Sequence, residues 1–433
     1  MGGFSTAGSN STAVGDAATA TGLNSNAFGA DTRALGNESL AGGEAALASA
    51  ANSTALGAYS QATAQGSVAV GNFASATSNR AVAIGQNAVA SGSVAVGGGA
   101  TATGTGSVAV GTDAQSTGQY SVAIGEDGSD GDSPGARPTG TQSTAVGVDA
   151  LATAGDTSAF GTGARANDQF GTALGAVAIN YGGTGATSVG AASATSGSNA
   201  AALGYQSYAR GDASSALGAA ATTNGLGDTS VGSLATTAGD RTTAVGYGAQ
   251  ATYDLGTSVG AAAIIYGGSK VTTVGAGSAA AGNQATALGS NSYANGVGNT
   301  ALGAISQTAG DRSTAVGYGA QANYNLGVSV GAASINYGGV SSTLVGAGSA
   351  SAGDRTAVFG ANASANGLGN TALGSLAQTA GDRSTAVGYG AQANNALGVA
   401  VGAAAINYGG VSTTAVGAGT ATGADRATAL GAN

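Results

Sequence analysis

Few residues in this chain could perform chemistry. The sequence has no His and no Cys, its single Lys is Lys270, and Asp plus Glu number 20 among 433 residues. Imidazole catalysis, thiolate chemistry, disulfides and the usual zinc ligands are therefore excluded. Ser and Thr are abundant, but no base is placed to activate one as a nucleophile. No Gly-x-x-x-x-Gly-Lys-[Ser/Thr] phosphate loop occurs either. We expect no enzymatic activity, no catalytic residue and no cofactor.

The densest group of carboxylates lies in the segment 126–138, which also holds both prolines. Closely spaced carboxylates can bind Ca²⁺ through hard oxygen ligands, but the EF-hand spacing and its terminal Glu are missing here. Proline suits a loop that leaves a regular ladder of strands. We therefore predict a solvated acidic loop rather than a metal site, and the best single candidate for a special contact. Its candidate contact residues are Glu126, Asp127, Asp130, Asp132 and Arg137.

A second polar feature is an Asp-Arg pair that recurs at intervals of 71 residues. An exposed ion pair within one chain would contribute at most ~1 kcal/mol. A link between neighbouring chains that fixes their register is the alternative that we favour. The recurring pairs are Asp240-Arg241, Asp311-Arg312 and Asp382-Arg383, and Asp354-Arg355 and Asp425-Arg426 repeat the pattern.

The elements that must position these residues follow a strict repeat, [Ser/Thr]-x-Ala-[Val/Leu/Ile/Phe]-Gly, as in Ser53-Thr54-Ala55-Leu56-Gly57. Fourteen residues, the commonest spacing, is too short for a helical hairpin and suits two short strands with two tight turns. We predict an all-β parallel solenoid of about 30 coils. The closing glycines are residues 15, 29, 43, 57, 71, 85, 97, 111, 125, 147, 161, 175, 190, 204, 218, 232, 246, 260, 275, 289, 303, 317, 331, 346, 360, 374, 388, 402, 417 and 431.

Each coil carries two columns of opposite kind in one strand. The residue before the closing glycine is Val, Leu, Ile or Phe in every coil except at Gly42, and the residue before that is usually Ala. A 14-residue coil encloses little width, so small side chains must fill it. We therefore place the alanines inside, among them Ala74, Ala76, Ala81 and Ala83, and the aliphatic column outside.

An outer aliphatic column is unfavourable in a monomer. Soluble monomers rarely expose apolar patches beyond a few hundred Å², and burying one such side chain contributes roughly 1.5–3 kcal/mol. The column therefore predicts lateral self-association, and closed rotational symmetry would bury it without a free edge. The spacing does not choose the number of chains. The predicted interface residues are Val70, Ile84, Val96, Val110, Val122, Ile124, Val146, Val245, Val316 and Val387.

The period breaks in three ways. The stretch between Gly85 and Gly97 is short, which predicts a trimmed turn after Ser91-Gly92. Four coils have 15 residues, and each carries a Tyr-Gly-Gly segment; the extra residue predicts a bulge or widened turn. We predict that Tyr181, Tyr266, Tyr337 and Tyr408 pack across a boundary between chains, with a recurrent ligand contact as the alternative. We divide the chain into regular repeats (1–125), the coil with the acidic loop (126–146) and the super-repeat region (147–433).

Composition supports this reading over disorder. The chain has 82 Gly and 7% charged residues, and low charge with a strict period is not typical of disordered chains. A net charge of −9 without a basic patch argues against nucleic-acid binding. No apolar run is long enough to span a bilayer, so we expect no membrane contact. No signal peptide follows Met1, and we interpret the chain as a fragment of something larger.

The repeat Gln119-Tyr120-Ser121-Val122-Ala123-Ile124-Gly125 resembles the Asn-Ser-Val-Ala-Ile-Gly repeat of YadA-type heads in trimeric autotransporter adhesins. The resemblance extends over essentially the whole chain. It implies a left-handed parallel β-roll assembled as a parallel homotrimer. It also implies display on the outer membrane surface of a Gram-negative bacterium, with the stalk and membrane anchor lying outside this fragment.

Adhesion is therefore the leading functional hypothesis, with many weak contacts acting together. The partners that we expect are the chain itself and an extracellular-matrix protein such as collagen or fibronectin, a cell surface or an abiotic surface. Outward polar residues such as Gln61, Ser75 and Thr77 would make the contacts. Ice binding and a passive structural spacer remain as alternatives.

Overall fold

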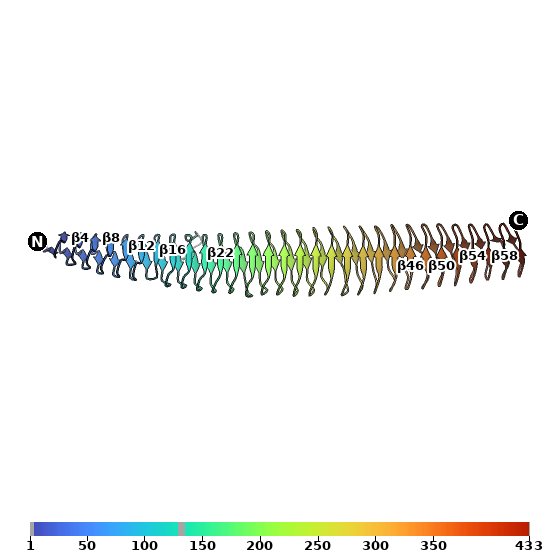
Figure 1. The fold of residues 1–433 in the computed structure, drawn as a ribbon, viewed down its shortest axis with the longest axis horizontal. Coiled ribbons are helices and arrows are strands. Elements are labelled where there is room, and N and C mark those ends of the chain that lie inside the picture. Colours follow the sequence, from blue (N-terminus) through green and yellow to red (C-terminus); the bar gives the residue numbers. More distant parts are fainter. Residues whose placement is uncertain (1–3, 129–134, 433) are drawn as a thin grey trace. The chain divides into compact units, whose positions relative to one another are not determined.

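The computed structural model describes residues 4–128 and 135–432. The chain forms two compact units, Met1–Ala220 and Ala221–Asn433. Within each unit the coils follow one another in chain order, and every coil contributes one longer and one shorter strand (Figure 1). No described segment forms a helix with the length and hydrophobicity needed to cross a membrane.

One rule gives the bounds of nearly all strands. Each even-numbered strand is the three residues before a closing glycine, from β2 (Thr12–Val14) to β30 (Ser215–Leu217) and from β32 (Thr229–Val231) to β60 (Thr428–Leu430). Each odd-numbered strand is the fourth and fifth residues after a closing glycine, from β3 (Thr19–Ala20) to β29 (Tyr208–Ala209) and from β31 (Thr222–Thr223) to β59 (Ala421–Thr422). The exceptions are β1 (Thr6–Ala7), before the first closing glycine, and β19 (Arg137–Pro138), after the inserted loop.

Strands pair in parallel with their counterparts one coil further on. β10 (Val68–Val70) pairs with β12 (Val82–Ile84), which places Ala69 beside Ala83. The register also holds across a 15-residue coil, where Thr257 pairs with Thr272. The extra residue is therefore accommodated in a corner and not in a strand. The even-numbered strands form one sheet of each unit (the even face) and the odd-numbered strands form the other (the odd face), so the predicted parallel β-solenoid is confirmed.

The odd face is interrupted where the acidic loop enters. The Gln115 N–H donates to the Ala136 carbonyl (3.0 Å) and the Thr117 N–H to the Pro138 carbonyl (3.2 Å), so β17 (Gln115–Ser116) makes its bonds toward β19. The bond in the opposite direction would need an N–H at Pro138, and proline has none. The ladder therefore ends at β17 and begins again at β19.

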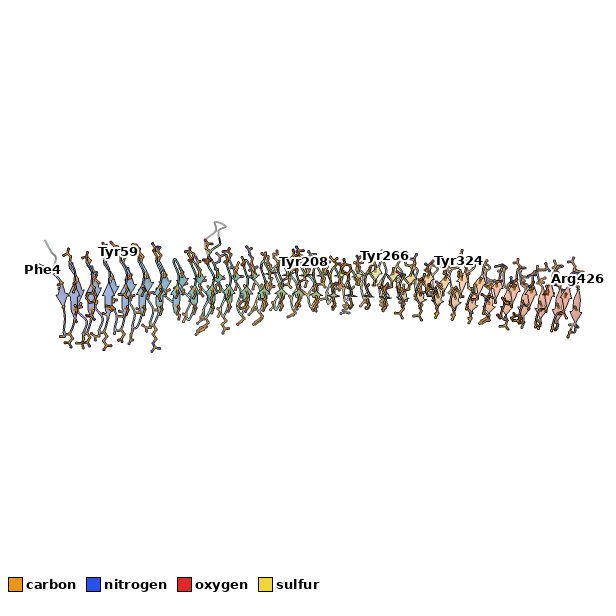
Figure 2. All side chains as sticks on the ribbon, turned by 90° about the horizontal axis from the view of Figure 1, so that it is seen from above. Phe4, Tyr59, Tyr208, Tyr266, Tyr324 and Arg426 are labelled. Atoms are coloured by element: carbon orange, nitrogen blue, oxygen red, sulfur yellow. The ribbon has the colours of Figure 1, made fainter. Side chains whose placement is uncertain are left out.

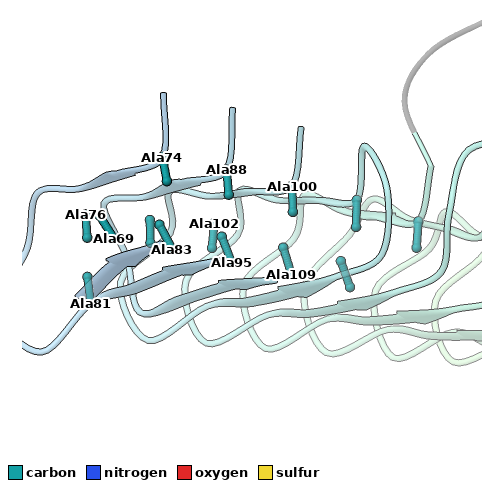
Figure 3. Close-up of a cluster of buried hydrophobic side chains, with 14 of the residues drawn as sticks. Ala69, Ala74, Ala76, Ala81, Ala83, Ala88, Ala95, Ala100, Ala102 and Ala109 are labelled. Carbon is teal, nitrogen blue, oxygen red and sulfur yellow. The ribbon is translucent and has the colours of Figure 1, made fainter. Parts of the chain in front are cut away.

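Alanine fills the inside of the coils, as predicted. Ala74, Ala76, Ala81 and Ala83 are all fully buried. Figure 3 shows such alanines from successive coils pointing into the space between the two strand layers. Side chains of this size let the two faces approach closely, which is why so few large residues are needed.

Two corners join the strands of each coil. The glycine corner leads from an even strand through the closing glycine to an odd strand, and the return corner leads back. Ser60 in a glycine corner donates its hydroxyl to the Gly57 carbonyl (2.8 Å), and Ser67 in a return corner does the same to Ala64 (2.6 Å). The same carbonyls also accept the backbone N–H of these serines (3.2 and 3.1 Å), so each serine closes its corner with two bonds. This local bonding favours Ser or Thr at the opening position of many motifs.

The 15-residue coils contain a packing device. Three of them turn an Asn into the interior, and the fourth turns in Ile265; Asn180, Asn336 and Ile265 are buried. Each of these inward side chains packs against a glycine in the preceding coil. At Gly327, for example, a Cβ would lie only 3.0 Å from Asn336 Nδ2, so the absence of a side chain there makes room for the Asn. The second glycine of each Tyr-Gly-Gly segment has a positive φ, between 86° and 105°, at the predicted distortion. The coil that follows Gly85 is shorter than the others. Its missing residues come from the return corner, between β13 (Val89–Ala90) and β14 (Val94–Val96).

Candidate interaction surfaces

The aliphatic column lies on the outside of the even face, as predicted. Ile84 is 40% exposed and Ile124 is 42% exposed, and the valines of the column are partly exposed. All predicted interface residues except Val122 directly precede a closing glycine; Val122 opens β18 (Val122–Ile124) and lies one column over on the same face. The single chain therefore presents an apolar column in each unit. That other chains cover it stays a prediction.

The glycine corner adds exposed apolar residues that the pattern of single coils did not reveal. In the second unit, Tyr247, Tyr318 and Tyr389 directly follow closing glycines and are 63–64% exposed. The preceding coils carry Leu234, Ile305 and Leu376 at this corner, all exposed and all with φ near +60°. Both sets recur every 71 residues, so aligning the super-repeat copies would have found them. They extend the apolar surface from the even face around the glycine corner.

The Asp-Arg pairs occupy the return corner. The Asp240 carboxylate accepts a hydrogen bond from the backbone N–H of Leu226, one coil earlier (3.0 Å). Asp311 and Asp382 do the same for their preceding coils (2.9 Å each). Each aspartate thus links two successive coils of one chain by a hydrogen bond. The 71-residue spacing of the Asp-Arg pairs does not indicate this role. The arginines are exposed. The Arg241 side chain passes over Gly227 in the preceding coil, since a Cβ built on Gly227 would lie 3.7 Å from Arg241 Cγ. Their link to a neighbouring chain stays a prediction.

The tyrosines of the 15-residue coils project from the odd face at its border with the return corner. Tyr181, Tyr266, Tyr337 and Tyr408 are 59–69% exposed. Tyr181 and Tyr208 flank a surface hollow of about 210 Å³ that is also lined by Arg210, and the Arg210 guanidinium lies 5.4 Å from the Tyr208 ring centre. Figure 2 shows Tyr208 and Tyr266 on the outside of the coils. Packing against another chain and contact with a ligand are both open to such side chains.

The acidic loop is anchored at both ends. At its beginning, the Asp127 N–H donates to the Thr112 carbonyl (3.2 Å) and the Gly128 N–H donates to Asp149 (3.0 Å). At its end, the Gly135 N–H donates to the Asp113 carbonyl (3.2 Å). Glu126 is exposed and Arg137 is half-buried. Asp130 and Asp132 lie outside the described residues. Within the described ranges, no group of three or more acidic residues is arranged to hold a metal ion.

The odd face of the first unit carries an outer column of hydroxyls. Gln61 and Thr77 are exposed and Ser75 is half-buried, so these predicted contact residues do point outward. Successive coils place Ser or Thr directly after the odd strand. The column consists of Ser49, Thr63, Thr77, Ser91, Thr103, Thr117, Thr139 and Thr153.

Burial raises the pKa of the Asp168 carboxyl above its ordinary value. Its Oδ2 lacks a hydrogen-bond partner among the described residues. A raised folded-state pKa stabilises the fold only while the group is protonated, so this contribution is lost as the pH rises above the ordinary value near 3.9. We predict that Asp168→Asn raises the melting temperature at pH 7 and leaves it unchanged at pH 3. Asp156→Asn, at an exposed site, is the charge-matched control, and an equal gain there would contradict the prediction.

Comparison with protein families identifies the repeat that forms these coils. Models of the YadA head domain repeat match residues 7–32, 34–60, 62–88, 88–114, 102–126, 139–164, 152–178, 224–249, 294–320, 365–391 and 380–405, which together make up more than half of the chain. Comparison with curated proteins finds no significant match. The matched repeats are non-enzymatic modules of adhesin heads, which are trimeric and exposed on Gram-negative outer membranes. The solenoid with its outer aliphatic column therefore belongs to the YadA head domain repeat family.

Proposed function

We propose that this chain is part of the head of a trimeric autotransporter adhesin and attaches a Gram-negative cell to a matrix protein, another cell or an abiotic surface. The observation that carries the proposal is the pairing of an apolar even face with a polar odd face in the first unit. The even face exposes Val, Leu, Ile and Phe, and the odd face of the first unit exposes hydroxyls and amides. One face suits assembly and the other suits contact with a wet surface.

The assembly in this proposal is a parallel homotrimer of left-handed coils, as in the family. Trimerisation multiplies each outward residue by three, and the coil repeat multiplies it again along the chain. Many weak contacts then act together, so avidity rather than any single strong site supplies the attachment.

Binding of the purified chain to immobilised collagen, fibronectin and whole cells tests the proposal. We expect the assembled chain to bind at least one of these and a monomeric variant to bind far more weakly, because it loses avidity. A second variant without residues 127–134, which restores the 14-residue spacing and keeps β19, tests the acidic loop as a special contact. An assembled chain that binds none of these or any abiotic surface would favour the passive spacer instead.

The hydroxyl column gives ice binding a specific observation in its favour. The neighbouring outer column in the odd strands is irregular, however, with Gln61, Ser75 and Val89 in successive coils. A flat two-dimensional hydroxyl array is therefore not formed, which favours adhesion. Thermal hysteresis in a solution of the chain would instead favour ice binding over adhesion.

The return-corner arginines carry a separate prediction about assembly. Replacing Arg241, Arg312 and Arg383 by Ala should lower the free energy of unfolding of the assembly by about 0.5–1 kcal/mol per exposed pair lost, and its melting temperature with it. Arg33 and Arg165, on exposed odd-strand positions, are the matched controls and should have no effect. Thermal melts followed by circular dichroism measure the difference. Equal melting temperatures for all variants would contradict the predicted Asp-Arg link between chains.

A further inference from the structure

Asn-Gly occurs three times in the sequence, at intervals of 71 residues: Asn224-Gly225, Asn295-Gly296 and Asn366-Gly367. Each copy lies at a return corner of the second unit, directly after an odd strand, and each Asn is exposed. Four residues after each Asn comes a fully or almost fully buried polar side chain. In the three copies this side chain is Asp228, Asn299 and Asn370, respectively.

In the first copy the buried carboxylate holds the glycine nitrogen. Asp228 Oδ2 accepts a hydrogen bond from the Gly225 N–H (2.8 Å). Asp228 Oδ1 accepts two more, from the Thr242 N–H (2.9 Å) and the Thr242 hydroxyl (2.7 Å). Both oxygens are thus fixed, and the Gly225 nitrogen is tied to a charged acceptor.

The other two copies replace the accepting oxygen by a donor. Asn299 Nδ2 donates to the Asn295 carbonyl (2.5 Å), and Asn370 Nδ2 donates to the Asn366 carbonyl (2.7 Å). An NH₂ group cannot accept a hydrogen bond from the following glycine. Within the described part of the chain, the Gly296 and Gly367 nitrogens donate to no acceptor.

The backbone conformation at the glycine differs between the first copy and the other two. Gly296 has a φ of 124° and Gly367 a φ of 115°, whereas Gly225 lies outside the left-handed region. Replacing one carboxylate oxygen by an amide nitrogen therefore accompanies a turned peptide between the Asn and the Gly. In these two copies the glycine nitrogen is left unbound next to an exposed Asn side chain.

We propose that Asn295 and Asn366 are sites of spontaneous deamidation and that Asp228 protects Asn224 from the same reaction. The glycine nitrogen gives its proton to solvent and attacks the Asn Cγ. An N–C bond forms, the bond to Nδ2 breaks, and ammonia leaves a five-membered succinimide. Water then opens either ring carbonyl to give aspartate or isoaspartate. Each event adds one negative charge to the odd face, independently of any adhesive role.

Mass spectrometry of peptides from the aged, folded chain tests the proposal at neutral to mildly alkaline pH. We expect positions 295 and 366 to deamidate about tenfold faster than position 224, because a hydrogen bond to a charged acceptor must first break there. Equal rates at the three positions of the folded chain would overturn the proposal.

Swapping the buried residue sharpens this test. Asp228→Asn should raise the rate at position 224 to that of the other sites, and Asn299→Asp should slow position 295. Asn366 in the same molecule is the internal control for both variants. In urea the three rates should converge, because the neighbouring residues are nearly identical. A difference that persists in urea would assign the effect to local sequence and refute the role of Asp228.

Discussion

Replacing the closing glycine Gly57 by alanine should unfold the coils around it. Gly57 has a φ of 128°, and a Cβ there would lie 2.5 Å from the Gly71 carbonyl oxygen. The backbone strain alone costs about 1–3 kcal/mol, and the contact cannot relax without separating two coils. We expect a total loss of about 2–4 kcal/mol of local stability, at the upper end of single substitutions. Because each coil contacts only its neighbours, the loss should stay local.

Hydrogen exchange read by mass spectrometry would locate this effect. Peptides from the coils that end at Gly57 and Gly71 should lose protection, and coils far away in the first unit should keep theirs. The control is Gly155→Ala, where φ is not positive and the nearest atom, the Thr141 carbonyl oxygen, lies 3.7 Å from the new Cβ. If both variants exchange alike, the closing glycine is not required by backbone geometry.

The coil, its small interior and its aliphatic exterior could be predicted from the sequence. These features depend on alternation within one strand and on the width of a 14-residue loop, and both are local properties. Ala81 and Ala83 lie inside and Ile84 lies outside for the reason that the sequence pattern indicates. The super-repeat and the distorted 15-residue coils also appear as counts along the chain.

Contacts between coils were harder to predict. The Asp311 carboxylate accepts a hydrogen bond from a backbone N–H in the preceding coil, a contact that its place beside Arg312 in the sequence does not indicate. Gly327 makes room for Asn336 in the next coil, and no pattern within its own coil indicates this. Such pairs lie 9 to 15 residues apart in sequence and become neighbours only once the coils are stacked in register. The conformation of Ile305, with a φ of 59°, also runs against the preference of a β-branched residue and follows from its place at a corner.

The second large effect concerns assembly. Replacing Val245, Val316 and Val387 by Asp places three charges in the aliphatic column of the second unit. If that column is the interface, each substitution removes roughly 1.5–3 kcal/mol of burial and adds a desolvated charge. We expect the assembly to dissociate into monomers. The coils should keep their circular dichroism signal, since these side chains lie on the outside.

Gln250, Gln321 and Gln392 offer a matched control for this experiment. They follow the three valines by five residues in each super-repeat copy and lie on the odd face instead. Replacing them by Asp adds the same charge to the coils that directly follow. Sedimentation analysis should then find monomers for the valine variant and the native mass for the glutamine variant. The reverse result would move the interface to the odd face, and it would leave the aliphatic column as the surface that meets the ligand.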